Sequence, residues 1–473
     1  MKRIPAGVVV FVLALGLYAA TTHRRVFSAG NDASRWAAIE SLVDYGTASV
    51  ERSRFAANID RIRLDGHDYS NKPPMLAFAG AAIYAALKTI FGWSLSGASA
   101  ARVLYWVTLV LVGVPSACLV AGYFVALARF PGLDLRWRGL LAAALGAGTL
   151  LFPFSTTLNN HAAAAALVFA ACLAALDGRG MSSGFAVGLA VAVDVLPGLG
   201  LAPIFAAMVW RGGNPKALTR FGLAFASCLL LAGAANVATH GSPLPVKLVP
   251  GAIDLSAQAG PAAGGVVLPQ NFAYPLEILG GGHGLFAVSP VLLWGAWGLA
   301  LACRRSAGGL PPGPLGEVAN WRLLAAGLVL QFAGHAALAG SYGGWSYGYR
   351  YLLPIQPLLL LAAPVALIGA RSVSRAFFAA VLPVSILSAA LGAYHPWPPA
   401  FEQESSGHPV ARLVHNPVGG NAAAWLAARA PESGLAGWAA RRFVSPDREL
   451  QRRYFALFFG SKGDLVTMKK FVD

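Results

Sequence analysis

Long apolar stretches recur along the whole chain, and they constrain its fold more than any other feature. Many are about 18 residues or longer, enough for a helix to cross a hydrocarbon core roughly 30 Å thick. Only 12% of the residues are charged, about half the share found in soluble proteins. The chain is therefore predicted to be an all-α polytopic membrane protein.

We expect about eleven transmembrane helices from the lengths of these stretches. The first follows Lys2 and Arg3 and is interpreted as a retained anchor rather than a cleaved signal peptide. The pair around DVLPG is either a helical hairpin of two short crossings or one long helix kinked at Pro197. The predicted spans are 4–20, 101–128, 139–157, 161–177, 184–195, 197–210, 221–239, 285–303, 322–340, 351–370 and 375–393.

The apolar segment 74–91 decides the predicted topology. If it does not cross the membrane, the short loops rich in arginine and lysine all fall on one side, as the positive-inside rule requires. We therefore interpret it as an interfacial or re-entrant helix. The N-terminus is then inside and the C-terminus outside, in an inner (cytoplasmic) membrane with the site facing the periplasm or exterior.

Two domains are predicted: a transmembrane domain at 1–393 and an outer extramembrane tail at 394–473. Within the first domain, 21–100 forms an outer loop with juxtamembrane helices. The formal net charge of +16 follows the loop topology, so it does not indicate nucleic-acid binding. The four cysteines lie in apolar segments without CxxC spacing, and no metal site is predicted.

Asp32 lies about a dozen residues after the first span, where a carboxylate can sit at the membrane face. It is either the N-cap of a surface helix or a base that removes a proton from an acceptor hydroxyl. Lys72 precedes Pro73 and Pro74, which hold it in an extended conformation. It either snorkels to water or binds a phosphate as a compact cation.

Arg350 begins a predicted span on the outer side, where the positive-inside rule disfavours it. A guanidinium there is suited to a bidentate phosphate contact, and the neighbouring Tyr347 lies either in the pocket or in an interfacial aromatic belt. Polar side chains at other outer helix starts are either caps or pocket residues, and Asp194, an acid within an apolar segment, is a further candidate. The helix-start residues are Asn159, Asn160, His161 and His283.

One carboxylate and separated cations on an outer face fit a particular reaction. Sugar nucleotides are not normally available outside the cytoplasm, whereas a polyprenyl-phosphate sugar is delivered by the membrane. Its leaving group is a stable phosphate, so no general acid is needed, unlike the paired carboxyls of glycoside hydrolysis. One base and cations for the departing phosphate suffice.

The ordered motifs resemble bacterial membrane glycosyltransferases of the GT-C superfamily, in particular the protein O-mannosyltransferase and aminoarabinose transferase group. They are the early Asp, Y-x-x-K-P-P at 69–74, N-N-H at 159–161 and G-W-x-x-G-x-R-x-L-L-P at 344–354. The resemblance covers most of 1–393. It implies a GT-C-like fold, with Asp32 as the catalytic residue and Lys72 and Arg350 as the phosphate contacts.

The same resemblance places Tyr69 beside Lys72 in the substrate pocket. Relatives commonly carry an acidic pair where this chain has Asn31 and Asp32, so a bound divalent metal stays open and no cofactor is assigned.

The predicted function is inverting sugar transfer from a polyprenyl-phosphate donor to a hydroxyl of a glycan, lipid or protein acceptor. The alternative is a lipid or polysaccharide transporter or flippase, although intramembrane charge is scarce and no internal repeat is visible. A membrane scaffold without chemistry is a third hypothesis, which leaves the placement of the two cations unexplained.

Overall fold

The computed structural model describes residues 4–27, 30–57, 60–255, 273–304, 310–338, 345–368, 372–399 and 417–472. Nearly every element within these ranges is a helix, so the predicted all-α fold class is confirmed. Gly343 and Gly344 of the late arginine motif, with parts of the 240–284 loop and of the C-terminal tail, lie outside the described residues.

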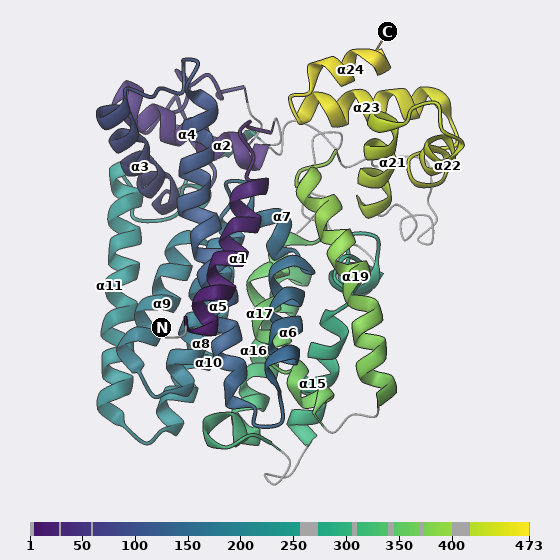
Figure 1. Ribbon diagram of the computed structural model, residues 1–473. Helices are drawn as coiled ribbons and strands as arrows, with labels where there is room; N and C mark the ends of the chain where they lie inside the picture. The colour runs from purple at the N-terminus through teal and green to yellow at the C-terminus, as the bar shows by residue number, and fades with distance from the viewer. Residues whose placement is uncertain are drawn as a thin grey trace.

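Helices run side by side through the body of the molecule (Figure 1) and enclose a continuous apolar core. Each predicted span coincides with one or more of them. In chain order they are α1 (Ala6–Thr21), α4 (Ala100–Thr108), η2 (Leu109–Gly113), α5 (Val114–Ala126), η3 (Leu127–Arg129), α6 (Leu135–Ala147), α7 (Leu151–Ser155), α8 (Asn160–Leu176), α9 (Gly180–Val193), α10 (Val195–Arg211), α11 (Pro215–His240), α13 (Ala273–Gly280), α14 (Leu285–Val288), α15 (Leu292–Arg304), η7 (Gly313–Gly316), α16 (Val318–Leu338), η8 (Arg350–Ile355), α17 (Gln356–Leu360), α18 (Ala363–Leu367) and α19 (Ser372–Tyr394).

Among the described residues, three continuous helices are long and apolar enough to cross a membrane: Ala100–Arg129, Pro215–His240 and Val373–Tyr394. A fourth span results if the bent pair Tyr274–Val288 and Leu292–Arg304, which turns by 110°, is one crossing. Shorter apolar helices accompany them. The larger number of crossings expected from the sequence stays a prediction.

The segment around DVLPG forms the hairpin rather than one kinked helix. α9 ends at Val193 and α10 begins at Val195, and the two helices pack against each other. A Cβ on Gly198 would come within 2.5 Å of the Val191 backbone nitrogen. Glycine therefore permits the close approach at this turn, which leaves Asp194 alone between the two helices.

Two predicted spans are interrupted where proline occurs. The bend between α14 and α15 falls at Ser289 and Pro290. The segment from Arg350 to Leu367 consists of a 3₁₀-helix and two short α-helices, and three prolines lie in it. Proline lacks the amide hydrogen that continues a helical ladder. One consequence is that Arg350 begins a 3₁₀ turn instead of a regular span.

The first outer loop contributes helices and an unexpected small sheet. The sheet has the antiparallel order β2-β1-β3, and its third strand comes from the 240–284 loop. The elements are α2 (Gly30–Glu40), the π-helical η1 (Ser41–Tyr45), β1 (Arg61–Leu64), β2 (His67–Ser70) and α3 (Met75–Phe91), followed later by η4 (Val246–Leu248) and β3 (Ile253–Asp254).

The β1–β2 hairpin gives the acids of the DGHDYSNKPP stretch a structural role. Asp65 and Gly66 form its turn with φ values of 50° and 82°, as two-residue hairpin turns require. Asp68 accepts hydrogen bonds at 2.8 Å from both Arg61 and Arg63 of the facing strand. The hairpin thus fixes the strand that leads directly to Lys72.

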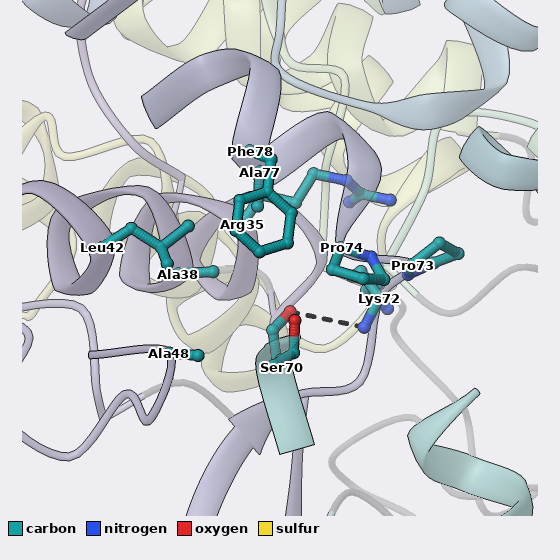
Figure 2. A pocket seen from close by; sticks show the side chains of 11 residues that line it. Arg35, Ala38, Leu42, Ala48, Ser70, Lys72, Pro73, Pro74, Ala77 and Phe78 are labelled. Atoms are coloured by element: carbon teal, nitrogen blue, oxygen red, sulfur yellow. Dashed lines mark hydrogen bonds between the residues drawn. The ribbon is translucent and has the colours of Figure 1, made fainter. Parts of the chain in front are cut away.

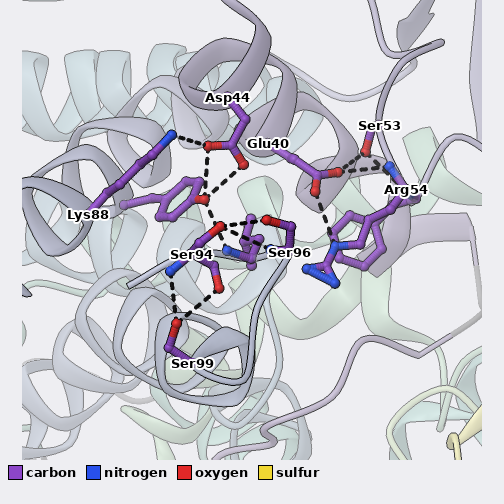
Figure 3. Close-up of polar contacts among 11 residues, drawn as sticks. Glu40, Asp44, Ser53, Arg54, Lys88, Ser94, Ser96 and Ser99 are labelled. Atoms are coloured by element: carbon purple, nitrogen blue, oxygen red, sulfur yellow. Dashed lines mark hydrogen bonds and ion pairs between the residues drawn. The ribbon is translucent and has the colours of Figure 1, made fainter. Parts of the chain in front are cut away.

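Ion pairs connect α3 to the segment that follows α2 (Figure 3). Asp44 of η1 accepts hydrogen bonds from Tyr84 and pairs with Lys88 Nζ at 2.7 Å. Glu40, at the end of α2, pairs with Arg54 at 3.1 Å. These helices therefore form one unit, while the interfacial position of α3 stays a prediction.

The last described residues form a helical cluster with its own aromatic core. It lies at the end of the molecule that also carries the first loop (Figure 1). Asn421 donates to the Leu391 carbonyl at 2.7 Å, and Arg25 donates to the Gly463 carbonyl at 2.6 Å. Its helices are α21 (Pro417–Arg429), α22 (Gly434–Phe443), α23 (Arg448–Ser461) and α24 (Leu465–Val472).

Candidate active site

Helix α2 brings Asp32 and Arg35 together in its first two turns, because residues three apart lie on one helix face. Both side chains are buried. The helix itself is buried throughout, since it packs between α3 and the small sheet. A carboxylate and a guanidinium are thus held on a rigid element at the end of the helix bundle.

Asp32 is almost completely enclosed, with 1% of its surface exposed. Its Oδ2 accepts a hydrogen bond from the Phe27 amide at 3.1 Å, while Oδ1 has no hydrogen-bond partner among the described residues. Burial raises the pKa of Asp32 to about 7, although the Phe27 amide and the Arg35 charge act to lower it. A carboxyl group with this pKa is suited to act as a base near neutral pH.

Arg35 is the centre of the cluster and did not figure among the sequence candidates. Its Nη1 donates to the Asn31 carbonyl at 2.7 Å and to the Asn31 side chain, and its Nη2 donates to the Asn160 side-chain oxygen. Burial and the positive charge of Arg350 lower the pKa of Arg35 to about 10. It therefore stays charged at neutral pH, close to a second guanidinium.

Lys72 lines a pocket with Arg35, and the Pro73–Pro74 pair lies beside both (Figure 2). Its Nζ pairs with Asp60 Oδ2 at 2.7 Å, and its amide donates to Ser70 Oγ at 3.3 Å. Burial lowers the pKa of Lys72 to about 8, although Asp60 acts to raise it. The ammonium is thus enclosed and paired, which differs from simple snorkelling into water.

The pocket has apolar walls as well as cations. The apolar side chains come from α2, from η1 and the loop after it, and from the start of α3, and they line the same pocket as the two cations. This combination suits an amphipathic ligand with an anionic group. The apolar lining residues are Ala38, Leu42, Ala48, Ala77 and Phe78.

Arg350 is buried with 6% of its surface exposed. Its Nε donates to His161 Nε2 at 3.3 Å. Its guanidinium lies over the rings of Tyr351 and Trp397, at 4.9 Å and 5.1 Å from their centroids. The Trp397 indole donates to Thr157 Oγ1 at 3.1 Å, and Thr157 lies beside the Asp32 carboxylate. Arg350 and Asp32 are therefore connected through one tryptophan and one threonine.

Two of the three N-N-H side chains are engaged around the cations. Asn160 accepts from Arg35, and His161 accepts from Arg350 while its Nδ1 lies 2.6 Å from Asp194 Oδ2. Asn159 instead caps α8: it accepts from the Ala162 amide at 3.0 Å and donates to backbone carbonyls. Asn159 is therefore a cap, and a substrate-pocket role of its two neighbours stays a prediction.

The other predicted pocket residues lie further from the cations or take structural contacts. Tyr347 is fully buried and donates to the Ser388 carbonyl at 2.6 Å. The His283 carbonyl accepts from the Tyr349 amide at 2.7 Å. Tyr69 packs its ring near His240, with centroids 6.1 Å apart. A direct contact of these three with a substrate stays a prediction.

The sequence resemblance left a bound divalent metal open, and the described part of the chain contains no candidate cluster for one. No group of three or more His, Cys, Asp or Glu side chains is arranged there to hold an ion.

Sequence reasoning missed Arg35 and Asp60. Arg35 follows Asp32 by three residues, so its position on the same helix face was available as a signal. Asp60 has no comparable signal, because the β1–β2 hairpin brings it to Lys72 across a twelve-residue separation. Its placement depends on tertiary structure, including the hydrogen bond from Ser34 Oγ to the Asp60 carbonyl at 2.7 Å.

No protein-family model and no curated protein sequence matches this chain. Two solved structures are similar to it, each over 98% of this chain and 74% of the other. They are ArnT from Cupriavidus metallidurans bound to undecaprenyl phosphate, at 16% identity and a TM-score of 0.48, and ArnT from the same organism in the apo state, at 15% identity and a TM-score of 0.49. ArnT is a GT-C aminoarabinose transferase, the group that the sequence motifs resemble.

Proposed function

We propose that the chain is a GT-C-type membrane glycosyltransferase that takes a sugar from a polyprenyl-phosphate donor. One observation carries the proposal: a pocket is lined by Lys72, apolar side chains and Arg35, and Arg35 lies three residues after the buried carboxylate of Asp32 on the same helix and acts on its charge. Arg350 adds a third cation whose charge acts on Arg35. The arrangement supports an anionic lipid as ligand and a base beside it.

In the proposed reaction, an acceptor hydroxyl attacks the anomeric carbon of the donor sugar. Asp32 takes the hydroxyl proton, a bond forms between the acceptor oxygen and the anomeric carbon, and the bond from that carbon to the phosphate oxygen breaks. Polyprenyl phosphate leaves with the electron pair, and the cations stabilise its developing charge. A single displacement on the face opposite the leaving group inverts the anomeric centre.

Lys72 and Arg35 have the principal role in phosphate binding, because both line the pocket. Donor binding replaces the contact of Lys72 with Asp60 by a contact with phosphate. The walls formed by Ala38, Leu42 and Phe78 accommodate the first part of the prenyl chain. The acceptor is a hydroxyl of a glycan, lipid or protein on the outer face of an inner membrane.

The test uses the purified full-length chain in lipid nanodiscs with a panel of radiolabelled polyprenyl-phosphate sugars and an envelope extract as acceptor. We expect at least one donor to be consumed, with label transferred to acceptor and polyprenyl phosphate released. No consumption of any donor, together with movement of the lipid between leaflets in liposomes, would establish the flippase alternative instead.

A matched pair of lysine variants localises the site. Lys72 and Lys88 each pair with an aspartate at 2.7 Å in the first loop, but only Lys72 lines the pocket. Lys72→Gln is expected to weaken donor binding at least about tenfold, the usual scale for a lost charge-assisted contact. Lys88→Gln is expected to leave binding unchanged, and equal effects of the two would contradict the assigned pocket.

A further inference from the structure

A buried chain of three side chains leads from Arg350, whose charge acts on Arg35 of the pocket, to the α9–α10 turn. His161 Nδ1 lies 2.6 Å from Asp194 Oδ2, and His161 Nε2 accepts a hydrogen bond from Arg350 Nε at 3.3 Å. The three residues come from separate segments: the turn between α9 and α10, the start of α8 and the start of η8. All three side chains are largely buried.

Hydrogen-bond chemistry fixes the direction of this chain. A guanidinium only donates, so His161 Nε2 must carry its lone pair toward Arg350. In the neutral imidazole the proton is then on Nδ1, which donates to the Asp194 carboxylate. Asp194 thereby selects the tautomer of His161 that can accept from Arg350.

The surroundings of Arg350 restrict the guanidinium on its other sides. Tyr351 and Trp397 lie against it through their rings. His161 accepts from its Nε–H, and the Tyr351 hydroxyl accepts from its Nη2 at 3.4 Å. The His161–Asp194 pair also lies in the field of two further basic side chains, Arg35 and His335.

An apolar trio at this junction would fill the space without the desolvation cost of a buried ionic chain. The ionic trio therefore lowers stability relative to an apolar trio. We attribute its presence to the position in which it holds Arg350.

We propose that His161 and Asp194 are positioning residues that hold the Arg350 guanidinium toward the donor phosphate. This inference rests on the proposed function, since it assigns Arg350 a phosphate to bind. Neither residue touches the substrate. Substitution of either residue is therefore expected to lower the affinity for polyprenyl phosphate only when Arg350 is present.

The test measures binding of polyprenyl phosphate to full-length variants in nanodiscs, with polyprenol as the phosphate-free comparison. His161→Phe and Asp194→Ala are expected to weaken binding about tenfold or more, the scale of one charge-assisted hydrogen bond. His161→Gln is expected to restore most of the affinity, because its amide can accept from Arg350 and donate to Asp194. Polyprenol binding is expected to be the same in all of them.

A double-mutant cycle separates positioning from general damage. In an Arg350→Gln background, His161→Phe is expected to cause no further loss. Tyr123→Phe is the control, because it removes another buried hydrogen bond, to the Leu360 carbonyl at 3.0 Å, between two helices. Unchanged affinity in His161→Phe, or an equal loss with and without Arg350, would overturn the inference. Failure of the unmodified chain to bind polyprenyl phosphate would overturn the proposed function, and this inference with it.

Discussion

At the scale of single residues, the proposed site combines a carboxyl group and an ammonium group whose pKa values lie close together. Burial raises the pKa of Asp32 to about 7 and lowers the pKa of Lys72 to about 8. Asp32 acts as a base only when it is deprotonated, and Lys72 binds phosphate best when it is protonated. The active combination is therefore most populated between these two values.

A bell-shaped pH profile of kcat/KM is the first prediction. The rate is expected to rise as Asp32 loses its proton near pH 7 and to fall as Lys72 loses its proton near pH 8. Steady-state rates with saturating acceptor and low donor would measure it. A flat profile from pH 5 to 9 would show that the protonation states of Asp32 and Lys72 do not control kcat/KM.

Asp60→Asn tests which residue causes the falling limb. The Asp60 carboxylate acts to raise the pKa of Lys72, so its neutralisation is expected to move the falling limb to lower pH and leave the rising limb in place. Asp44→Asn is the matched control, because Asp44 pairs with Lys88 outside the pocket. A shift of the falling limb in Asp44→Asn but not in Asp60→Asn would refute the assignment to Lys72.

The sequence was sufficient to select Lys72 and Arg350, because each is placed against a local expectation. Lys72 is fixed by the prolines that follow it, and Arg350 opposes the charge bias of the loops. The pairings of these residues were not predictable in the same way, although His161 itself was a sequence candidate. Asp60 and His161 reach them only through long-range packing of separate segments.

At the scale of elements, hydropathy located the helices but not their interruptions. The predicted span at 351–370 is η8, α17 and α18, since prolines interrupt its helical ladder. The small sheet was missed, although the Asp65–Gly66 turn is a recognised hairpin signal. Hydrophobic periodicity reports which face is buried, but it does not report where a chain reverses.

The interfacial position of α3 gives the prediction at this scale. If α3 does not cross the membrane, the exposed Ala98 lies on the same side as Arg52 of the first loop, and Arg136 lies on the other side beyond the continuous helix Ala100–Arg129. Single cysteines at these positions, in a chain whose four native cysteines are replaced, would be labelled with an impermeant reagent in intact cells. Labelling of Ala98→Cys unlike both Arg52→Cys and Arg136→Cys, which then lie on one side, would show that α3 spans.

At the scale of the whole molecule, the C-terminal cluster is joined to the site end of the bundle by hydrogen bonds and ring contacts. Asn421 is fully buried and donates to the carbonyls of Leu391 and His395, at 2.7 Å and 3.0 Å. His395 in turn contacts Ser461 at 3.0 Å. Because Trp397, which lies over Arg350, follows this junction directly, docking of the tail supports the site.

Asn421→Ala is predicted to loosen this docking. It removes the side-chain hydrogen bonds to the Leu391 and His395 carbonyls, although the Leu391 carbonyl still accepts from the His395 amide at 3.4 Å, and a lost buried partner costs about 1–3 kcal/mol. We expect a lower thermal midpoint in detergent and faster limited proteolysis than in the exposed-site control Arg448→Ala. Equal stability and equal proteolysis of the two variants would show that Asn421 does not hold the cluster.

The central claim is that Asp32 performs chemistry on a donor that the neighbouring cations hold. Its most direct test measures donor binding and single-turnover sugar transfer on the same preparations of the unmodified chain and Asp32→Asn. The account predicts that Asp32→Asn binds the polyprenyl-phosphate sugar with nearly unchanged affinity and transfers it at least about a hundredfold more slowly, as expected for loss of a general base. Transfer by Asp32→Asn at the unmodified rate would contradict the account.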